Sequence, residues 1–336
     1  MEFNLFKFLT ISRFYNLLKI FVSYLLSNLT KRVIVWGYPI TFSIEPTNRC
    51  NLKCPECPSG TGTLTRPLGL LDVKKFEEII DQIKEFTFYI QLFFQGEPFI
   101  NKNIYKMINY ARKNNIYISI STNGLLLNDN NINELLKSPP DKLIFSIDGM
   151  SQNTYEKYRV GGEFKKASES LENLLKFKKE KKLKLPYIEL QFIAMKQNEH
   201  EIEDVIKFGK LIGVDKVLIK SMQVSSYESA VEYLPENKKY SRYYIKNGEL
   251  LFKNKLKNRC FAVWRTSVIT WDGIVSPCCF DKDAKYKFGN IFVEKFKDIW
   301  TNNKYTNFRK AIIKNRKGID ICTNCTEGLN MNLIEK

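Results

Sequence analysis

Short apolar runs that alternate with helix-like segments constrain the fold of this chain more than any other feature. The runs are rich in β-branched and aromatic residues and cover Ile40–Ile44, Phe88–Phe94, Ile116–Ile120, Leu143–Ile147, Ile188–Ile193 and Lys216–Ile219. The segments between them have helical character and cover Asp72–Phe86, Asn103–Asn114, Asn131–Lys137, Lys165–Lys181 and His200–Ile212. Near-continuous apolar strands that alternate with helices predict a parallel sheet covered on at least one face. Six such units predict an α/β protein built on a partial (β/α)6 TIM-like barrel.

A conspicuous polar segment follows each of these predicted strands. A cysteine-containing loop follows the first, and the others are followed by Gln95–Pro98, Ser121–Gly124, Ser146–Gly149, Met195–Asn198 and Lys220–Met222. The active sites of such barrels form at the carboxyl ends of the strands. We therefore expect the six segments to converge on one mouth.

The loop after the first strand carries three cysteines, Cys50, Cys54 and Cys57, with the spacing C-x3-C-x2-C. Three thiolates can hold a cubane iron–sulfur cluster and leave one iron open to a ligand. The same spacing would suit one face of a helix, but Pro55 and Pro58 argue against a continuous helix. Zinc usually takes four ligands from two paired motifs, and the loop has neither a histidine nor a second CxxC nearby. The loop therefore favours an iron–sulfur cluster with an open iron.

The other five cysteines lie in the C-terminal quarter, at Cys260, Cys278, Cys279, Cys322 and Cys325. The pair in Cys322-Thr-Asn-Cys325 completes a set of four thiolates with Cys260 and Cys278. A structural zinc and buried, unreactive thiols are the alternative interpretations of this set. Between Cys260 and Cys278, the stretch from Trp271 to Ile274 predicts a hairpin turn between two short strands.

From Pro39 to Ser225 the sequence resembles the radical S-adenosylmethionine (SAM) enzymes. Cys50, Cys54 and Cys57 resemble the cluster loop of this family, although Glu56 stands where the family usually has an aromatic residue beside the adenine. The resemblance also implies SAM contacts at later strand ends. Gly96 and Glu97 would hold the methionine amino group, and Ser121 and Asn123 the ribose. The resemblance implies that Ser146 and Asp148 contact SAM or the substrate. It also implies that Arg159 could pair with the methionine carboxylate of SAM.

The C-terminal segment resembles the SPASM extension of these enzymes. It carries Gly273 four residues before Cys278, and Gly289-Asn-Ile291 and Asp298-Ile-Trp300 before the last cysteine pair. Because no cysteine follows Cys325, the resemblance implies one auxiliary cluster, as in the shortened twitch version. The expected cofactors are two [4Fe–4S] clusters, one open and one closed, together with SAM. Cys279 is left over, and either packs beside its neighbour or donates a hydrogen atom to a substrate radical.

The resemblance implies an enzyme that cleaves SAM reductively and abstracts hydrogen from a substrate carbon. Oxidation, dehydrogenation or another modification of a peptide or a small polar metabolite is the expected outcome. Lys220 and Asp281 are candidates for a general base, with ordinary surface charges as the alternative, because His200 is the only histidine. Two other interpretations stay open: a non-enzymatic iron–sulfur electron-transfer protein, and a radical SAM enzyme directed at RNA.

Composition limits the partners of the protein. The formal net charge is +17, and lysine supplies 42 of the 53 basic residues, whereas arginine supplies 11. The charge permits an anionic partner, but the scarcity of arginine argues against nucleic acid. A solvated lysine-rich surface is the simpler interpretation. An electron donor such as a flavodoxin or ferredoxin is also expected.

Cysteines clustered in CxxC-type pairs in a chain of 336 residues predict a reducing, cytoplasmic environment.

Residues 1–32 combine leucine and phenylalanine with lysine and arginine, and their longest uncharged run, Ile20–Thr30, is too short to span a bilayer. They predict either a helix packed on the body of the protein or a basic amphipathic helix on the inner face of a membrane. The predicted organisation is an N-terminal helical extension at 1–37, the partial barrel at 38–225, a linker at 226–259, and a small α+β iron–sulfur domain at 260–336.

Overall fold

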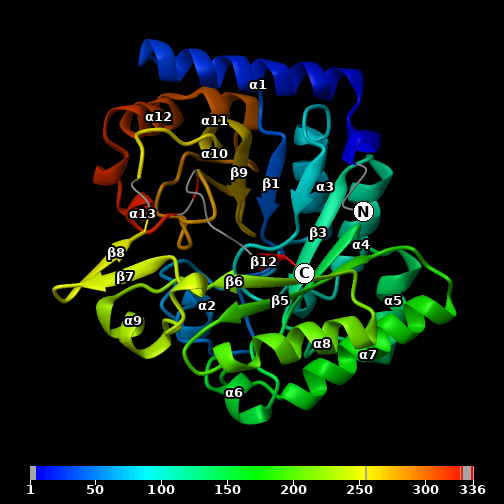
Figure 1. The fold of residues 1–336 in the computed structure, drawn as a ribbon. Coiled ribbons are helices and arrows are strands. Elements are labelled where there is room, and N and C mark those ends of the chain that lie inside the picture. The colour runs from blue at the N-terminus through cyan, green and yellow to red at the C-terminus, as the bar shows by residue number, and fades with distance from the viewer. Residues whose placement is uncertain (1–4, 254–255, 326, 328–333, 336) are drawn as a thin grey trace. The chain divides into compact units, whose positions relative to one another are not determined.

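The computed structural model describes residues 5–253, 256–325, 327 and 334–335. The chain forms two compact units, and Figure 1 labels their helices and strands. The first unit comprises Met1–Arg49, Leu64–Ser119 and Leu256–Leu329. The second unit comprises Cys50–Thr63, Ile120–Lys255 and Asn330–Lys336. The cysteine loop and the C-terminal cysteines therefore belong to different units.

The sheet of the first unit is parallel at its centre. Its strands lie in the order β11, β10, β9, β1, β2, β3, with the bounds β1 Thr41–Ile44, β2 Tyr89–Gln91, β3 Tyr117–Thr122, β9 Thr266–Ile269, β10 Ile274–Ser276 and β11 Gly289–Asn290. β9, β1, β2 and β3 pair in parallel, whereas β10 pairs antiparallel with β9 and β11. The predicted hairpin at Trp271–Ile274 is confirmed, and Gly273 adopts a φ of 87° in its turn.

The second unit continues from the end of β3 and has its own run of parallel strands. β4 (Lys142–Ser146), β5 (Tyr187–Ala194) and β6 (Lys216–Ser221) pair in parallel in that order. The short β12 (Ile334–Glu335) pairs antiparallel with β6. The six predicted strands are thus all present, each within a few residues of its predicted bounds.

Helices connect successive parallel strands, as the sequence predicts. Their bounds are α1 Ile11–Thr30, α2 Pro58–Thr61, α3 Val73–Ile83, α4 Ile104–Lys113, α5 Asp129–Lys137, α6 Gln152–Glu156, α7 Phe164–Glu180, α8 Ile202–Ile212, α9 Tyr227–Tyr233, α10 Ala262–Arg265, α11 Phe296–Thr301, α12 Asn303–Asn315 and α13 Asp320–Thr323. α3 illustrates the cause. Asp72 caps it by accepting bonds from the Lys74 and Lys75 amides, and its apolar residues recur at helical spacing and are buried.

The segment predicted as a linker, 226–259, contains regular structure. It includes α9 and an antiparallel hairpin of β7 (Tyr243–Lys246) and β8 (Glu249–Phe252). Residues 254–255 lie outside the described part. Asn247 and Gly248 both have positive φ in the hairpin turn, the backbone that a two-residue turn requires. The Asn-Gly pair at this turn is therefore the signal in the sequence that indicates a hairpin.

The N-terminal extension is a long helix, α1, in the first unit, and residues 1–4 lie outside the described part. Thr10 caps the helix, and Lys31 ends it with a φ of 59°. The Tyr24 ring packs 4.8 Å from the Phe261 ring and 5.5 Å from the Trp264 ring, measured between centroids. The Trp264 indole also donates to the Ile34 carbonyl. Within the described residues, no helix is long and apolar enough to cross a membrane.

Candidate functional site

The three-cysteine loop lies in the second unit and is not helical between Cys50 and Cys54. It turns at Cys54, where the Cys57 amide donates to the Cys54 carbonyl, and α2 begins directly after Cys57. Cys54 is buried, whereas Cys50 and Cys57 are partly exposed. The predicted break of the helix by Pro55 and Pro58 therefore agrees with the observed loop.

Gly60 holds the loop close to α2. A Cβ at this position would stand 2.5 Å from the Cys54 nitrogen and 2.7 Å from its oxygen, so the backbone of Cys54 fills the space of a side chain. The Lys53 amide donates to the Val160 carbonyl on the other side of the loop. Glu56, where the resemblance suggests an aromatic residue, accepts a bond of 2.8 Å from the Ser225 amide. These contacts fix the loop within the second unit.

A buried ion pair lies beside the Cys54 thiol. Arg159 donates from Nε to Oδ2 of Asp148 at 2.6 Å, and the side chain of Asp148 is fully buried. Burial raises the pKa of the Cys54 thiol, and the Arg159 guanidinium opposes that rise. Oδ1 of Asp148 accepts from the Ile193 amide, which fixes the carboxylate. Arg159, which the resemblance assigns to the methionine carboxylate, pairs with Asp148 here.

The predicted ribose residues lie at the end of β3 in the same unit. Asn123 donates to Oδ1 of Asn51 at 2.9 Å, which links the strand end directly to the cysteine loop. Its own Oδ1 accepts from the Leu125 amide. Ser121 is partly exposed on β3, and Ser146 is buried at the last position of β4. The second unit therefore carries five of the seven predicted SAM contacts.

Gly96 and Glu97, the other two, belong to the first unit. Gly96 has a φ of 75°, and a Cβ there would stand 2.5 Å from the Arg49 carbonyl oxygen. The Glu97 amide donates to the same carbonyl at 2.8 Å. Only glycine fits a backbone so close to another. The Gly-Glu segment is therefore bonded to the residue that precedes Cys50 in the chain.

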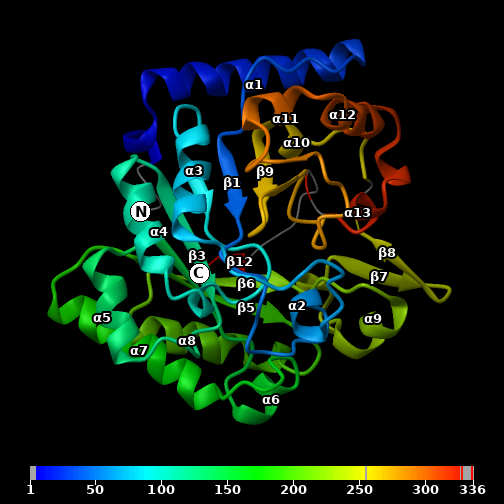
Figure 2. The ribbon, with the colours of Figure 1, turned by 180° about the vertical axis from the view of Figure 1, so that it is seen from behind.

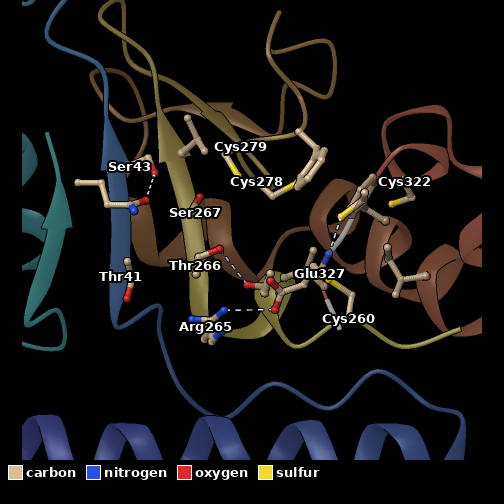
Figure 3. Close-up of a pocket in the computed structure, with 18 of the residues that line it drawn as sticks. Thr41, Ser43, Cys260, Arg265, Thr266, Ser267, Cys278, Cys279, Cys322 and Glu327 are labelled. Atoms are coloured by element: carbon tan, nitrogen blue, oxygen red, sulfur yellow. Dashed lines mark hydrogen bonds and ion pairs between the residues drawn. The ribbon is translucent and has the colours of Figure 1, made fainter. Parts of the chain in front are cut away.

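The five C-terminal cysteines line one cavity of about 210 Å³ in the first unit. Figure 3 shows the labelled Cys260, Cys278, Cys279 and Cys322 around it. Cys260 precedes α10, Cys278 and Cys279 follow β10, Cys322 is in α13, and Cys325 follows α13. Cys260, Cys322 and Cys325 are buried, and Cys279 is exposed.

Arg316 contacts this group of thiols, and its side chain is 1% exposed. Its Nη2 donates to Sγ of Cys325 at 3.2 Å, and its Nη1 donates to the Arg259 and Glu327 carbonyls. Burial raises the pKa of both Cys260 and Cys325 to about 11, against the attraction of Arg316. Such thiols ionise at neutral pH only when bound cations compensate the burial of their charge.

The predicted general bases differ in their surroundings. Asp281 is 1% exposed, and its carboxylate accepts bonds from the Ser276 hydroxyl and from the Lys285 and Tyr286 amides. This pattern is that of a residue that stabilises a turn. Lys220, on β6 in the second unit, donates to Oε1 of Gln191 at 3.2 Å.

The chemistry of both thiol sets fits iron–sulfur clusters, whose irons are held by cysteine thiolates. Among the described residues, no three His, Cys, Asp or Glu side chains converge on a point that one ion could occupy. A cubane holds its thiolates on separate irons, so its ligands need not converge on one point. The four-thiol cavity also provides volume in the middle of its ligands.

Residues 44–209 match the radical SAM superfamily, and residues 260–326 match the SPASM iron–sulfur cluster-binding domain. The chain belongs to the radical SAM superfamily and carries a SPASM-type C-terminal domain. Its cofactors are those of the family, a SAM-binding [4Fe–4S] cluster with an auxiliary cluster site. Cys50, Cys54 and Cys57 lie within the first match, and the C-terminal cysteines within the second.

The chain is 28% identical over 314 residues to the tungsten-containing aldehyde ferredoxin oxidoreductase cofactor-modifying protein of Pyrococcus furiosus, covering 84% of this chain and 86% of that protein. It is 31% identical over 137 residues to mycofactocin maturase MftC of Mycobacterium ulcerans, which covers 40% of this chain and 36% of the relative.

Among solved structures, SuiB of Streptococcus suis bound to SAM matches with a TM-score of 0.64 at 16% identity, over 89% of this chain and 75% of SuiB. BtrN in complex with AdoMet and 2-DOIA matches with a TM-score of 0.54 at 19% identity, over 88% of this chain and 96% of BtrN. These likenesses confirm the predicted fold, a partial TIM barrel with a C-terminal domain.

Sequence reasoning did not identify Arg316, Gly60 or Asn51 as site residues. Gly60 lies only three residues after Cys57, and a glycine that close to a ligand loop is a signal for tight backbone packing. Arg316 and Asn51 have no comparable signal, because their partners are distant in the sequence.

Proposed function

We propose that this protein is a radical SAM enzyme that oxidises its substrate with the help of one auxiliary cluster. The observation that carries the proposal is the division of the eight cysteines into a loop of three and a cavity lined by five, of which we assign all but Cys279 as ligands. Three thiolates leave one iron of a cubane open, and four leave none. The loop of Cys50, Cys54 and Cys57 would therefore bind the cluster that SAM ligates. The cavity of Cys260, Cys278, Cys322 and Cys325 would hold a closed cluster.

When reduced and bound to SAM, the open cluster supplies a 5′-deoxyadenosyl radical that takes a hydrogen atom from a substrate carbon. The surrounding residues bind and orient. Arg159 and Asp148 keep a compensated charge pair beside Cys54, and Asn123 ties the strand end to the loop through Asn51. Gly96 allows the backbone of Glu97 to approach the residue before Cys50, where its carboxylate suits an ammonium group.

The net reaction that we propose is a two-electron oxidation. One electron from an external donor of the flavodoxin or ferredoxin type enters with each SAM cleaved. The substrate would lose a hydrogen atom, which ends in 5′-deoxyadenosine, and then an electron and a proton. The site of Cys260, Cys278, Cys322 and Cys325 would take the electron, and a base would take the proton. The products would be a substrate with one new double or cross-linking bond, methionine, 5′-deoxyadenosine and a proton, and the electron taken at that site would return to the external donor.

The substrate class that we propose is a peptide or a small polar metabolite. Named relatives include a cofactor-modifying protein and the PqqA peptide cyclase of Bradyrhizobium diazoefficiens, and SuiB has been solved with its precursor peptide SuiA. These relatives support both classes for this chain. Within these two classes, the formal charge of +17 favours acidic substrates. It also favours an acidic electron donor.

The test uses protein purified and reconstituted without oxygen. With dithionite and SAM, the wild type should release 5′-deoxyadenosine, and the variant with Cys50, Cys54 and Cys57 changed to Ala should release none. The matched control is Cys279→Ser, which leaves all seven proposed ligands in place and should retain cleavage. Iron-loaded wild type that never yields 5′-deoxyadenosine, with or without candidate peptides, would instead support the electron-transfer interpretation.

A further inference from the structure

The helix α1 packs on the first unit with a mainly polar side, since four of its five buried residues are polar and the fifth is Ile20. Arg13, 4% exposed, donates to the backbone carbonyls of Phe8, Lys84, Asn114 and Asn115. Further along the helix, Asn16 exchanges two bonds with the backbone of Tyr38, and Ser27 bonds with the backbone of Ile34. Ser23 is also buried. Helices in globular proteins usually bury their apolar side instead.

The opposite side of α1 is apolar and exposed. Eight large side chains there are between 41% and 78% exposed: Ile11, Phe14, Tyr15, Leu18, Phe21, Val22, Leu25 and Leu29. Figures 1 and 2 show α1 beside α10, α11 and α12, with no other drawn element of the first unit on its outer side. Exposed apolar surface of this extent marks an interaction site. We define these eight residues as the apolar face of α1.

The charges that the helix segment itself carries are all positive. Lys7, Lys19, Lys31 and Arg32 are exposed, and the sequence from Leu5 to Ile44 contains no aspartate or glutamate. An apolar stripe on a helix segment whose own charges are all basic complements a surface that is apolar inside and anionic outside. A bilayer with anionic headgroups has this chemistry.

A second copy of the chain complements the face less well. Two copies paired through α1 would bring the same basic residues near one another without an acidic residue from this segment to pair with them. Like charges at an interface oppose association. The charge pattern therefore favours a lipid surface over a dimer.

We propose that the apolar face of α1 docks the protein on a membrane surface that contains anionic lipids. The helix lies in the plane of the surface, because its polar side is bonded to the first unit and is not available to lipid. A helix of 20 residues is about 30 Å long, which gives one continuous contact. This inference goes beyond the proposed function and does not depend on either cluster.

Sedimentation with vesicles tests the proposal with the full-length, reconstituted protein. We expect the wild type to sediment with vesicles of phosphatidylcholine and phosphatidylglycerol in equal parts. With vesicles of phosphatidylcholine alone, and with anionic vesicles at high salt, binding should be at least about tenfold weaker. The variant Ile11→Gln, Leu18→Gln, Leu29→Gln should also lose at least about tenfold in affinity, since glutamine preserves the helix but not the apolar surface.

The matched control is the variant Leu211→Gln, Val231→Gln, Val293→Gln. These three side chains are 85%, 50% and 82% exposed, against 78%, 42% and 78% for the residues changed in α1. The control variant should bind vesicles like the wild type, and both variants should retain full iron content and SAM cleavage. Equal losses in both variants, or no sedimentation of the wild type with anionic vesicles, would overturn the proposal. So would a wild-type dimer that the α1 variant converts to a monomer in sedimentation equilibrium.

Discussion

At the scale of single residues, the two thiol sets have different electrostatic surroundings. Cys54 lies beside an arginine that is already compensated by Asp148. Cys325 accepts a hydrogen bond from Arg316, and the charge of Arg316 interacts with Cys260, Cys322 and Cys325. A cationic donor to a cluster thiolate stabilises the more negative, reduced form of the cluster. Arg316 should therefore raise the reduction potential of the auxiliary cluster.

The variant Arg316→Gln should lower the midpoint potential of the auxiliary cluster. The potential is best measured by an EPR redox titration in a background where Cys50, Cys54 and Cys57 are Ala, so that one cluster remains. Arg316→Lys keeps the positive charge and should shift the potential less. If Gln and Lys give the wild-type potential while iron content is full, Arg316 only stabilises the fold.

Glu56 should support SAM binding indirectly through the position of the loop. Its carboxylate accepts a bond from the Ser225 amide in an exposed position. Because one such bond is worth about 1 kcal/mol or less, Glu56→Ala should weaken SAM binding by at most about fivefold. Glu56→Gln keeps an acceptor oxygen and should bind SAM like the wild type. A loss much larger than fivefold in titration calorimetry would mean that Glu56 contacts SAM itself.

The cysteines and strand-end residues could be predicted from sequence because their signals are local. Spacing identifies Cys50, Cys54 and Cys57, and position after a strand identifies Asn123. Arg316 could not be predicted in this way, because its partners include Arg259, 57 residues away. The hydrogen bond between Glu56 and Ser225 could not be predicted either, because the two residues are 169 positions apart in the sequence. Such contacts depend on the packing of distant elements.

At the scale of elements, a buried ion pair joins three segments of the first unit. Arg66 donates to both carboxylate oxygens of Glu45, which follows β1 and is fully buried. Glu45 also accepts from the Trp271 amide in the turn between β9 and β10. The Arg66 guanidinium contacts the Lys282 carbonyl. The pair thus fixes the end of β1 against the hairpin of the C-terminal segment.

Arg66→Met should destabilise the first unit by about 3–5 kcal/mol, because it leaves the buried Glu45 carboxylate without its partner. Thermal unfolding followed by circular dichroism measures the change. The double variant Glu45→Met, Arg66→Met removes both charges and should recover much of the loss. Equal destabilisation of the single and double variants would show that packing, rather than the unpaired charge, is responsible.

The elements differ in how well the sequence predicts them. Strands β1 to β6 could be predicted because each is a short, continuous apolar run between two helix-like segments. Runs of this length in that position are more often strands than helices. The orientation of α1 on the first unit could not be predicted. Its period shows an apolar side and a mainly polar side with Arg13, Asn16, Ser23 and Ser27 around Ile20. Burial of the mainly polar side depends on backbone groups at Tyr38, Lys84 and Asn115. Periodicity alone would have predicted the reverse.

At the scale of the whole molecule, the chain carries two cysteine sets in two units that are interleaved in sequence. The unit with the four-thiol cavity contains both the N-terminal helix and the C-terminal cysteines. The unit with the three-cysteine loop is formed mainly from the middle of the chain. Loss of one cluster should therefore leave the thiol ligands of the other in place.

Iron analysis of ligand variants tests this independence. Reconstituted wild type should contain about eight irons per chain, from two four-iron clusters. Cys322→Ala with Cys325→Ala should contain about four and unfold at a lower temperature, since its buried thiols and Arg316 lose their counter-charge. Changing Cys50, Cys54 and Cys57 to Ala should also leave about four. If the cavity of the wild type contains zinc instead of iron, the site is structural and cannot be the proposed electron acceptor.

The claim on which this account depends most is that the three-cysteine loop holds a cluster with an open iron that SAM ligates. The most direct measurement is the EPR spectrum of the dithionite-reduced Cys322→Ala, Cys325→Ala variant, with and without SAM. The four-iron signal of this variant should change when SAM is added. The auxiliary signal, in the variant without Cys50, Cys54 and Cys57, should be unaffected by SAM. A loop cluster whose spectrum is the same with and without saturating SAM would contradict the account.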